Sequence, residues 1–181
     1  EIDSQIREVI DFPKKGISFK DITPLLMNKS ISDKIILEFK SRILDFEIDA
    51  IVGIESRGFL YGFLLANKLG IPFIPIRKSG KLPCETIKYK YELEYGVSEV
   101  EIHKNDIKKG WNVLIHDDLL ATGGTACAAA ELIELSGANV AGFAFVVSLE
   151  YLNALPKLKK YSSNIILSLI HISEPTRLDD I

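Results

Sequence analysis

The chain has 181 residues, of which 47% are hydrophobic and 26% charged, and its formal net charge is −3. These values are typical of one folded domain with a buried core, and they exclude intrinsic disorder. There is no strong basic excess and no apolar run long enough to cross a bilayer, so we expect no nucleic-acid or membrane partner. Cys84 and Cys127 lie far apart and form no metal-binding or redox motif, which predicts a reduced, cytoplasmic protein.

The first half of the chain alternates between predicted helices and strands. Apolar residues at helical spacing predict an amphipathic helix over residues 31–46. Asp49–Ile54 is a short apolar run typical of a buried parallel strand. A helix is predicted over Gly58–Leu69, and Phe73–Ile76 predicts a second strand.

The same alternation continues in the second half. Residues 89–95 and 97–103 alternate around a glycine and predict a hairpin or extended flap. Val113–His116 predicts the third core strand, Ala126–Ser136 a helix, and Val140–Leu149 a further strand. The pattern predicts an α/β fold with a mainly parallel central sheet flanked by helices.

A glycine-containing loop, Ala121–Thr125, joins the third strand to the next helix. The first N–H groups of a helix lack partners within the helix, and the positive end of its dipole favours an anion. Gly123 and Gly124 allow close approach of the backbone, and Thr122 and Thr125 add hydroxyl donors. The loop therefore predicts a phosphate site, with a simple tight turn as the alternative.

Two carboxylates, Asp117 and Asp118, directly precede this loop. They repel a phosphate, so they must serve another group. Vicinal sugar hydroxyls are one candidate, and a Mg²⁺ held mainly by substrate oxygens is another. A plain capping role for the pair is the structural alternative. Together with the loop, the pair predicts a pocket for a ribose 5-phosphate.

The segment DDLLATGGT, residues 117–125, resembles the 5-phosphoribosyl 1-pyrophosphate signature of the type I phosphoribosyltransferases. Its Leu-Leu-Ala is especially similar to the adenine phosphoribosyltransferases of that family. The resemblance implies that Asp117 and Asp118 hold the ribose hydroxyls and that the following loop holds the 5′-phosphate. His116 departs from the apolar residue expected there and is assigned no role.

The loop Glu55-Ser56-Arg57 follows the first strand and precedes a helix. Arg57 is poorly placed for the helix dipole, a conflict that a bound anion would resolve. Without further information, the local sequence of this loop indicates only a helix cap. The resemblance implies a pyrophosphate-binding loop with a cis peptide between Glu55 and Ser56.

Arg77, Lys78 and Lys81 cluster around a Ser-Gly turn after the second strand. A cluster of cations like this one is usually part of a solvated surface. Their RK-x-GKLP pattern is similar to that of the adenine phosphoribosyltransferases, which implies that they stabilise the charge that develops on departing pyrophosphate.

Residues 91–102 read alone as a charged hairpin, but they resemble the family's flexible catalytic loop with the core LEYG. That match implies that Glu94 is the acid/base and Tyr95 its neighbour on a lid. Such a lid keeps water away from the sugar cation.

Residues 12–26, FPKKGISFKDITPLL, resemble the family's adenine-specific hood. The resemblance implies that Phe19 stacks on the purine and that backbone groups of Ile17 and Ser18 read the adenine edge. Lys20 stands where some members have arginine. Alone, the segment is a surface loop with a buried phenylalanine.

The resemblance as a whole implies that adenine and 5-phosphoribosyl 1-pyrophosphate are converted to AMP and pyrophosphate in purine salvage. It implies Mg²⁺ bound with the substrate, with no ligand supplied directly by the protein, and a homodimer. A sibling activity on hypoxanthine, guanine or xanthine is the nearest alternative. A non-catalytic sensor of the phosphoribosyl donor is another.

We expect a single domain over residues 1–170, with the hood in about the first 30 residues and a last strand over Asn164–Ile170. Residues 167–177 look like the conceptual translation of a sequencing adaptor. Residues 171–181 are therefore expected to be a non-native tail that packs poorly and carries no function.

Overall fold

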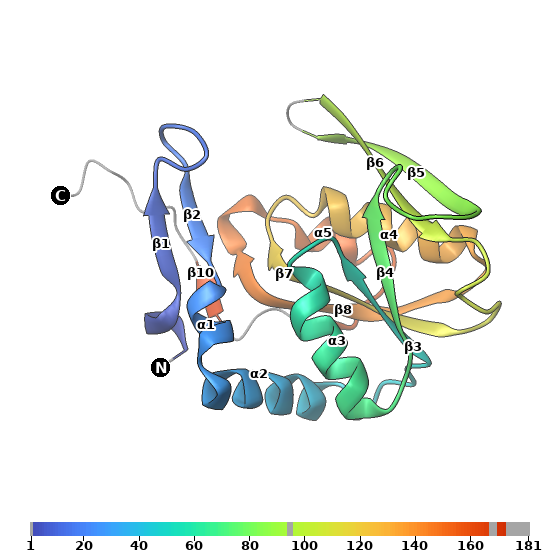
Figure 1. Ribbon diagram of the computed structural model, residues 1–181, viewed down its shortest axis with the longest axis horizontal. Coiled ribbons are helices and arrows are strands. Elements are labelled where there is room, and N and C mark those ends of the chain that lie inside the picture. Colours follow the sequence, from blue (N-terminus) through green and yellow to red (C-terminus); the bar gives the residue numbers. More distant parts are fainter. Residues whose placement is uncertain (1, 94–95, 167–169, 173–181) are drawn as a thin grey trace.

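The computed structural model describes residues 2–93, 96–166 and 170–172. Its centre is an eight-stranded sheet in the order β10-β8-β7-β3-β4-β6-β5, with β9 beside β8 (Figure 1). Its strands are β3 (Ala50–Ile54), β4 (Phe73–Lys78), β5 (Thr86–Leu93), β6 (Gly96–His103), β7 (Asn112–Leu120), β8 (Asn139–Leu149), β9 (Ile165–Ile166) and β10 (Ile170–Ile172). Pairing is parallel from β10 to β4 and antiparallel from β4 to β5, which confirms the mainly parallel α/β fold.

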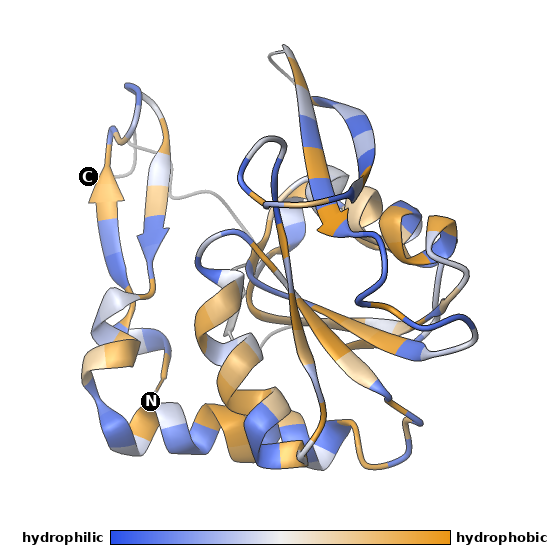
Figure 2. Ribbon diagram, turned by 45° about the vertical axis from the view of Figure 1, so that its right-hand side comes forward, coloured by the Kyte–Doolittle hydropathy of each residue, from blue (hydrophilic) through white to orange (hydrophobic). Residues whose placement is uncertain are grey.

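Helices cover both faces of this sheet. The helices α2 (Lys29–Arg42) and α3 (Gly58–Leu69) pack on one face, and α4 (Gly124–Leu135) packs on the other. Alternate strand residues serve the two cores, so Val52 packs toward α4 and Ile51 toward α2 and α3. In Figure 2 the central strands are accordingly hydrophobic through most of their length. Among the described helices, none is both long and apolar enough to span a membrane.

Several predicted boundaries differ from the structure. The helix predicted over residues 31–46 is α2, which ends earlier, at Arg42, and begins at Lys29 because the Asn28 side chain accepts a hydrogen bond from the N–H of Ile31. The strand predicted to end at His116 is β7, which continues to Leu120. β8 pairs with β7 as far as Leu120, and this pairing keeps the polar residues after His116 extended.

The hood is a small antiparallel sheet of its own. It consists of β1 (Arg7–Ile10) and β2 (Ser18–Asp21). Figure 1 shows this hairpin standing apart from the central sheet, to which α1 (Thr23–Met27) and α2 connect it. The hairpin β5–β6 projects from the opposite end of the central sheet.

The chain described beyond β8 contains a 3₁₀ turn (Glu150–Leu152), the short helix α5 (Leu155–Leu158) and two short strands. The predicted last strand corresponds to β9 and β10, which both pair in parallel with β8. The backbones of His171 and Ile172 belong to β10, whereas residues 173–181 lie outside the described part. The domain limit and the non-native origin of the tail therefore stay predictions.

Candidate active site

The predicted phosphate loop joins the end of β7 to the first turn of α4. Gly123 has a φ of +83°, and a side chain there would press on Ala154, with an added Cβ lying 3.1 Å from the Ala154 Cβ. Glycine is needed on both counts. The first N–H groups of α4 have no acceptor within the helix and remain available to an anion.

A small pocket of about 80 Å³ lies against this loop, a size that suits a phosphate group. Asp117, Thr122, Gly123 and Thr125 contribute to its lining. From outside, the Lys157 ammonium donates a hydrogen bond of 3.1 Å to the carbonyl of Thr122. Nothing local in the sequence marks this contact of Lys157, because α5 lies far along the chain from the loop.

The acidic pair lies within β7, where consecutive side chains point to opposite faces of the sheet. Asp117 lines the phosphate pocket, and its Oδ1 accepts the backbone N–H of Asp118 at 2.9 Å. The Asp118 carboxylate is 3% exposed and forms an ion pair with Arg57, with 3.0 Å between Oδ2 and Nε. The two neighbouring carboxylates therefore have different partners.

Burial, and next to it the charge of Asp118, raises the pKa of Asp117 well above its ordinary value. Burial also raises the pKa of Asp118, although the Arg57 guanidinium opposes that shift. The ionised pair is thus short of stabilising partners among the residues that the structure describes. Hydroxyl donors or a cation supplied by a ligand would favour the ionised form.

Arg57 connects the acidic pair to the hood. Its guanidinium lies 5.0 Å from the centre of the Phe19 ring, in a cation–π contact, while its Nε pairs with Asp118. The Asp118 carboxylate is the partner of Arg57 in this arrangement, and the contact of Arg57 with a bound anion stays a prediction. The buried Nη1 of Arg57 has no hydrogen-bond acceptor among the described residues.

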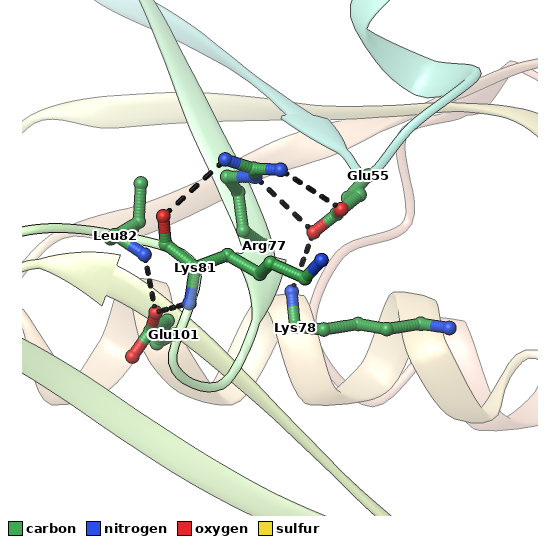
Figure 3. A network of polar contacts seen from close by, with 6 residues as sticks. All are labelled: Glu55, Arg77, Lys78, Lys81, Leu82 and Glu101. Atoms are coloured by element: carbon green, nitrogen blue, oxygen red, sulfur yellow. Dashed lines mark hydrogen bonds and ion pairs between the residues drawn. The ribbon is translucent and has the colours of Figure 1, made fainter.

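The peptide bond between Glu55 and Ser56 is cis, as the resemblance implies. The Glu55 carboxylate accepts hydrogen bonds from Arg77, at 3.1 Å from Nη2 and 3.3 Å from Nε, and from the N–H of Lys78 at 2.8 Å (Figure 3). Burial opposes ionisation of Glu55, but these donors lower its pKa. Glu55 thus orients Arg77, and direct contacts of Glu55 and Ser56 with pyrophosphate stay predictions.

The turn that carries Lys81 is organised by Glu101, which lies in β6 and is 1% exposed. One Glu101 oxygen accepts the N–H groups of Lys81 and Leu82 at 2.9 and 2.8 Å, as Figure 3 shows. Burial opposes ionisation, but these hydrogen bonds hold the pKa of Glu101 below its ordinary value. No local signal marks Glu101, because alternation with Val100 and Ile102 in a strand predicts an exposed glutamate.

The cationic ends of Lys78 and Lys81 are held less tightly than the guanidinium of Arg77, although the charge of Lys81 helps to lower the pKa of Glu55. No hydrogen bond or ion pair holds the ammonium groups of Lys78 and Lys81 among the residues that the structure describes. Of the three predicted cations, Arg77 is therefore held by Glu55, whereas Lys78 and Lys81 are available to an anionic ligand. The segment with these cations lies at the carboxyl end of β4, the loop Glu55-Ser56-Arg57 follows β3, and the predicted phosphate loop follows β7. Because these strands are parallel neighbours, all three segments lie at one edge of the sheet.

In the hood, Phe19 packs edge-on against Phe12 with 5.2 Å between ring centres. Lys20 forms an ion pair of 2.6 Å with Glu8, which also accepts the hydroxyl of Ser18. The backbone of Ile17 is used within the hood, since its N–H donates to Lys14 and its carbonyl accepts from Phe12. That Ile17, Ser18, Phe19 and Lys20 meet adenine stays a prediction.

The predicted catalytic residue Glu94 and its neighbour Tyr95 lie outside the described residues. The flanking strands β5 and β6 pair in register up to Leu93 and Gly96, so the predicted hairpin is present. The roles of Glu94 and Tyr95 on a lid stay predictions.

His116 is fully buried in β7 and packs against the Phe39 ring at 5.6 Å. Neither ring nitrogen has a hydrogen-bond partner within the described part of the chain. Burial lowers the pKa of His116 to about 4, only partly opposed by the backbone of Ala144. The histidine is therefore neutral in the folded protein at neutral pH.

This buried histidine should make the protein less stable in mild acid. Between pH values of about 6.5 and about 4 the unfolded chain binds a proton that the folded chain does not, so the free energy of unfolding falls as pH falls. We expect His116→Leu to remove this component, so that the variant gains about 2 kcal/mol over the parent at pH 5 relative to pH 7. Urea unfolding at both pH values measures it, and an identical pH dependence in the two proteins would contradict it.

Comparison with known proteins assigns the class to which this fold and loop belong. The family model described as "Phosphoribosyl transferase domain" matches residues 23–180. The chain therefore belongs to the phosphoribosyl transferase domain family.

Its relatives share a more particular name. An adenine phosphoribosyltransferase of Christiangramia forsetii is 50% identical over 173 residues, covering 96% of this chain and 99% of the relative. The crystal structure of adenine phosphoribosyltransferase from Thermoanaerobacter pseudethanolicus superposes with a TM-score of 0.90 at 47% identity, covering 94% and 98% of the two chains. The Saccharomyces cerevisiae enzyme, complexed with adenine and an imino-altritol bisphosphate, has a TM-score of 0.85 at 42% identity, with 92% and 95% covered.

Proposed function

We propose that this chain converts adenine and 5-phosphoribosyl 1-pyrophosphate to AMP and pyrophosphate, a pentosyl transfer in purine salvage. One observation carries the proposal: Arg57 contacts both the Phe19 ring and the Asp118 carboxylate. An aromatic surface for a base thus lies beside a carboxylate suited to a sugar, next to a phosphate loop. Close relatives bearing the adenine phosphoribosyltransferase name support this assignment.

In the proposed reaction, N9 of adenine attacks C1′ of the ribose as pyrophosphate leaves. Asp117 and Asp118 hold the ribose hydroxyls, and residues 121–125 hold the 5′-phosphate. These contacts place the two reacting atoms together, which is a large part of the catalysis. Glu94 takes up or returns a purine proton while the lid excludes water.

Cationic side chains stabilise the negative charge that grows on the leaving pyrophosphate. Lys78 and Lys81 reach it with free ammonium groups, and Arg77 is held in place by Glu55. Arg57 contributes once the ligand competes with Asp118 for its guanidinium. Their positions are set before the reaction, so little reorganisation is needed as the charge develops.

The proposed reaction uses Mg²⁺ bound with the phosphoribosyl donor. Within the described ranges, no three His, Cys, Asp or Glu residues cluster in a way that would hold a metal ion. Asp117 and Asp118 are nevertheless suited to lie near a cation that the substrate holds, because an approaching cation would lower their raised pKa values. Mg²⁺ held by substrate oxygens, with no ligand supplied directly by the protein, would neutralise pyrophosphate charge.

Side-by-side assays of AMP and IMP formation test the base assignment. We expect adenine-dependent release of pyrophosphate with AMP as product, and much slower IMP formation from hypoxanthine. Faster formation of IMP or of another purine nucleotide would overturn the choice of adenine. Binding of the donor without any release of pyrophosphate would favour the non-catalytic sensor.

We also propose a homodimer that forms through the outer face of α3. This face exposes Leu60, Phe63 and Leu64, with Phe63 56% exposed, and α3 is hydrophobic along most of its length in Figure 2. A contiguous apolar face of this kind is typical of protein interfaces.

The free thiols of Cys84 and Cys127 support the proposed cytoplasmic location.

A charge on the α3 face should separate the proposed dimer. We expect Phe63→Glu to be monomeric at protein concentrations where the parent is dimeric, because dimerisation would bury the new carboxylate. Sedimentation velocity measures the two states. Leu37→Glu on α2, also 56% exposed, is the matched control and should stay dimeric. A dimeric Phe63→Glu variant would place the interface elsewhere.

A further inference from the structure

The strand that leads toward the predicted lid touches the phosphate loop through Tyr91 in β5. The Tyr91 hydroxyl lies 3.2 Å from the Oγ1 of Thr125, and both side chains are partly buried. The Tyr91 ring also lies over the start of α4, where a Cβ added to Gly124 would be 3.9 Å from its Cδ2. Tyr91 is therefore seated on the first turn of the helix that would receive the phosphate.

Thr125 and Tyr91 line different cavities. Thr125 lines the pocket of about 80 Å³ at the phosphate loop. The other cavity, of about 310 Å³, is lined in part by Tyr89, Tyr91 and Gly124. Tyr91 thus contacts the Thr125 hydroxyl without itself lining the pocket that would receive the phosphate.

The chemistry of the hydroxyl decides the direction of this hydrogen bond when phosphate is bound. A phosphate oxygen accepts hydrogen bonds, so Thr125 must donate its only hydroxyl proton to it. The Tyr91 hydroxyl then donates to a lone pair of Thr125 Oγ1. A hydroxyl that accepts one hydrogen bond becomes a stronger donor in another.

We infer that Tyr91 is a positioning residue for the 5′-phosphate, which orients and polarises the Thr125 hydroxyl from β5. The inference rests on the proposed function, because it assigns the loop to the ribose 5-phosphate end of the donor. It also links donor binding to β5, the strand that ends just before Glu94.

Tyr91→Phe tests the role, because it removes the hydroxyl and keeps the ring. We expect the Kd for ribose 5-phosphate and the KM for 5-phosphoribosyl 1-pyrophosphate to rise about fivefold, the effect of one neutral hydrogen bond. The turnover number and the Kd for pyrophosphate alone should stay close to the parent values. A general loss of packing would instead raise the Kd for both ribose 5-phosphate and pyrophosphate. The unchanged Kd for pyrophosphate therefore distinguishes the proposed role from a packing defect.

Two further variants make the test specific. Tyr89→Phe removes a hydroxyl two residues earlier on the same strand and at the same cavity, and should leave ribose 5-phosphate binding unchanged. Thr125→Val removes the hydroxyl through which Tyr91 acts. In that background Tyr91→Phe should weaken binding no further, because the shared hydrogen bond is already absent.

Additive effects of Tyr91→Phe and Thr125→Val would overturn the inference, as would an equal loss in Tyr89→Phe or an unchanged Kd for ribose 5-phosphate in Tyr91→Phe. Binding of ribose 5-phosphate needs no catalysis, so it is measured separately from the proposed function. A parent protein that binds ribose 5-phosphate but forms no AMP would reject the function and leave the positioning role standing.

Discussion

Asp118→Asn should raise the KM for 5-phosphoribosyl 1-pyrophosphate by about 100-fold, since hydrogen bonds to charged groups are each worth roughly 1.5–3 kcal/mol. Asparagine has nearly the same shape but lacks the negative charge that pairs with Arg57 and that, in the proposed function, holds two ribose hydroxyls. Steady-state kinetics with varied donor measures the change. The Kd for ribose 5-phosphate should rise in parallel, because the ribose contacts do not require the pyrophosphate group.

Asp106→Asn provides the matched control for this charge change. Asp106 lies in an exposed turn, where its carboxylate meets His103. The control should keep the parent KM and turnover number. An Asp118→Asn variant with an unchanged KM and a lower turnover number would mean that Asp118 acts in the chemical step, and its assignment to ribose binding would then be wrong.

Glu94→Gln should lower the turnover number by about 10²–10⁴-fold, the usual contribution of a general acid or base. The amide keeps the size of the side chain but cannot accept and return a proton near neutral pH. The KM for the donor should change much less, since the proposed contacts with ribose and phosphate come from other residues. Single-turnover measurements report the chemical step separately from product release.

Glu92→Gln is the control, because Glu92 precedes Glu94 by two residues and is exposed at the end of β5. It should retain the parent turnover number. If Glu94→Gln were fully active, another group would have to handle the purine proton. If both variants were equally impaired, the loss would reflect the charge of the hairpin in general.

Features that depend on contiguous residues were predictable from the sequence. Residues 117–125 contain the acidic pair, the glycine turn and the helix start in one stretch, and the structure places them together at the end of β7. The helix over Gly58–Leu69 agrees in both bounds, because apolar periodicity and a terminal glycine with a φ of +70° are local signals. The predicted end of the strand at His116 failed, since pairing with β8 decides how far β7 extends.

Features that depend on distant segments were not predictable in this way. The contact of Arg57 with Phe19 requires the hood to fold against the sheet edge, and no local pattern encodes that approach. The same holds for Glu101, which binds the turn at Lys81 from a neighbouring strand. Lys157 and Tyr91 belong to the same group, because each reaches the phosphate loop from an element far away in the chain.

The sequence by itself determined the α/β class, the glycine-containing loop over residues 121–125 and the identity of the charged groups, because hydrophobic periodicity and short-range motifs depend on adjacent residues. Only the tertiary structure decided how those charges are used. Asp117 faces the phosphate pocket while Asp118 pairs with Arg57, and Arg77 is anchored while Lys78 and Lys81 remain available. The physical reason is that burial and pairing depend on which strands lie side by side, and β-sheet order brings together residues that are far apart in the chain.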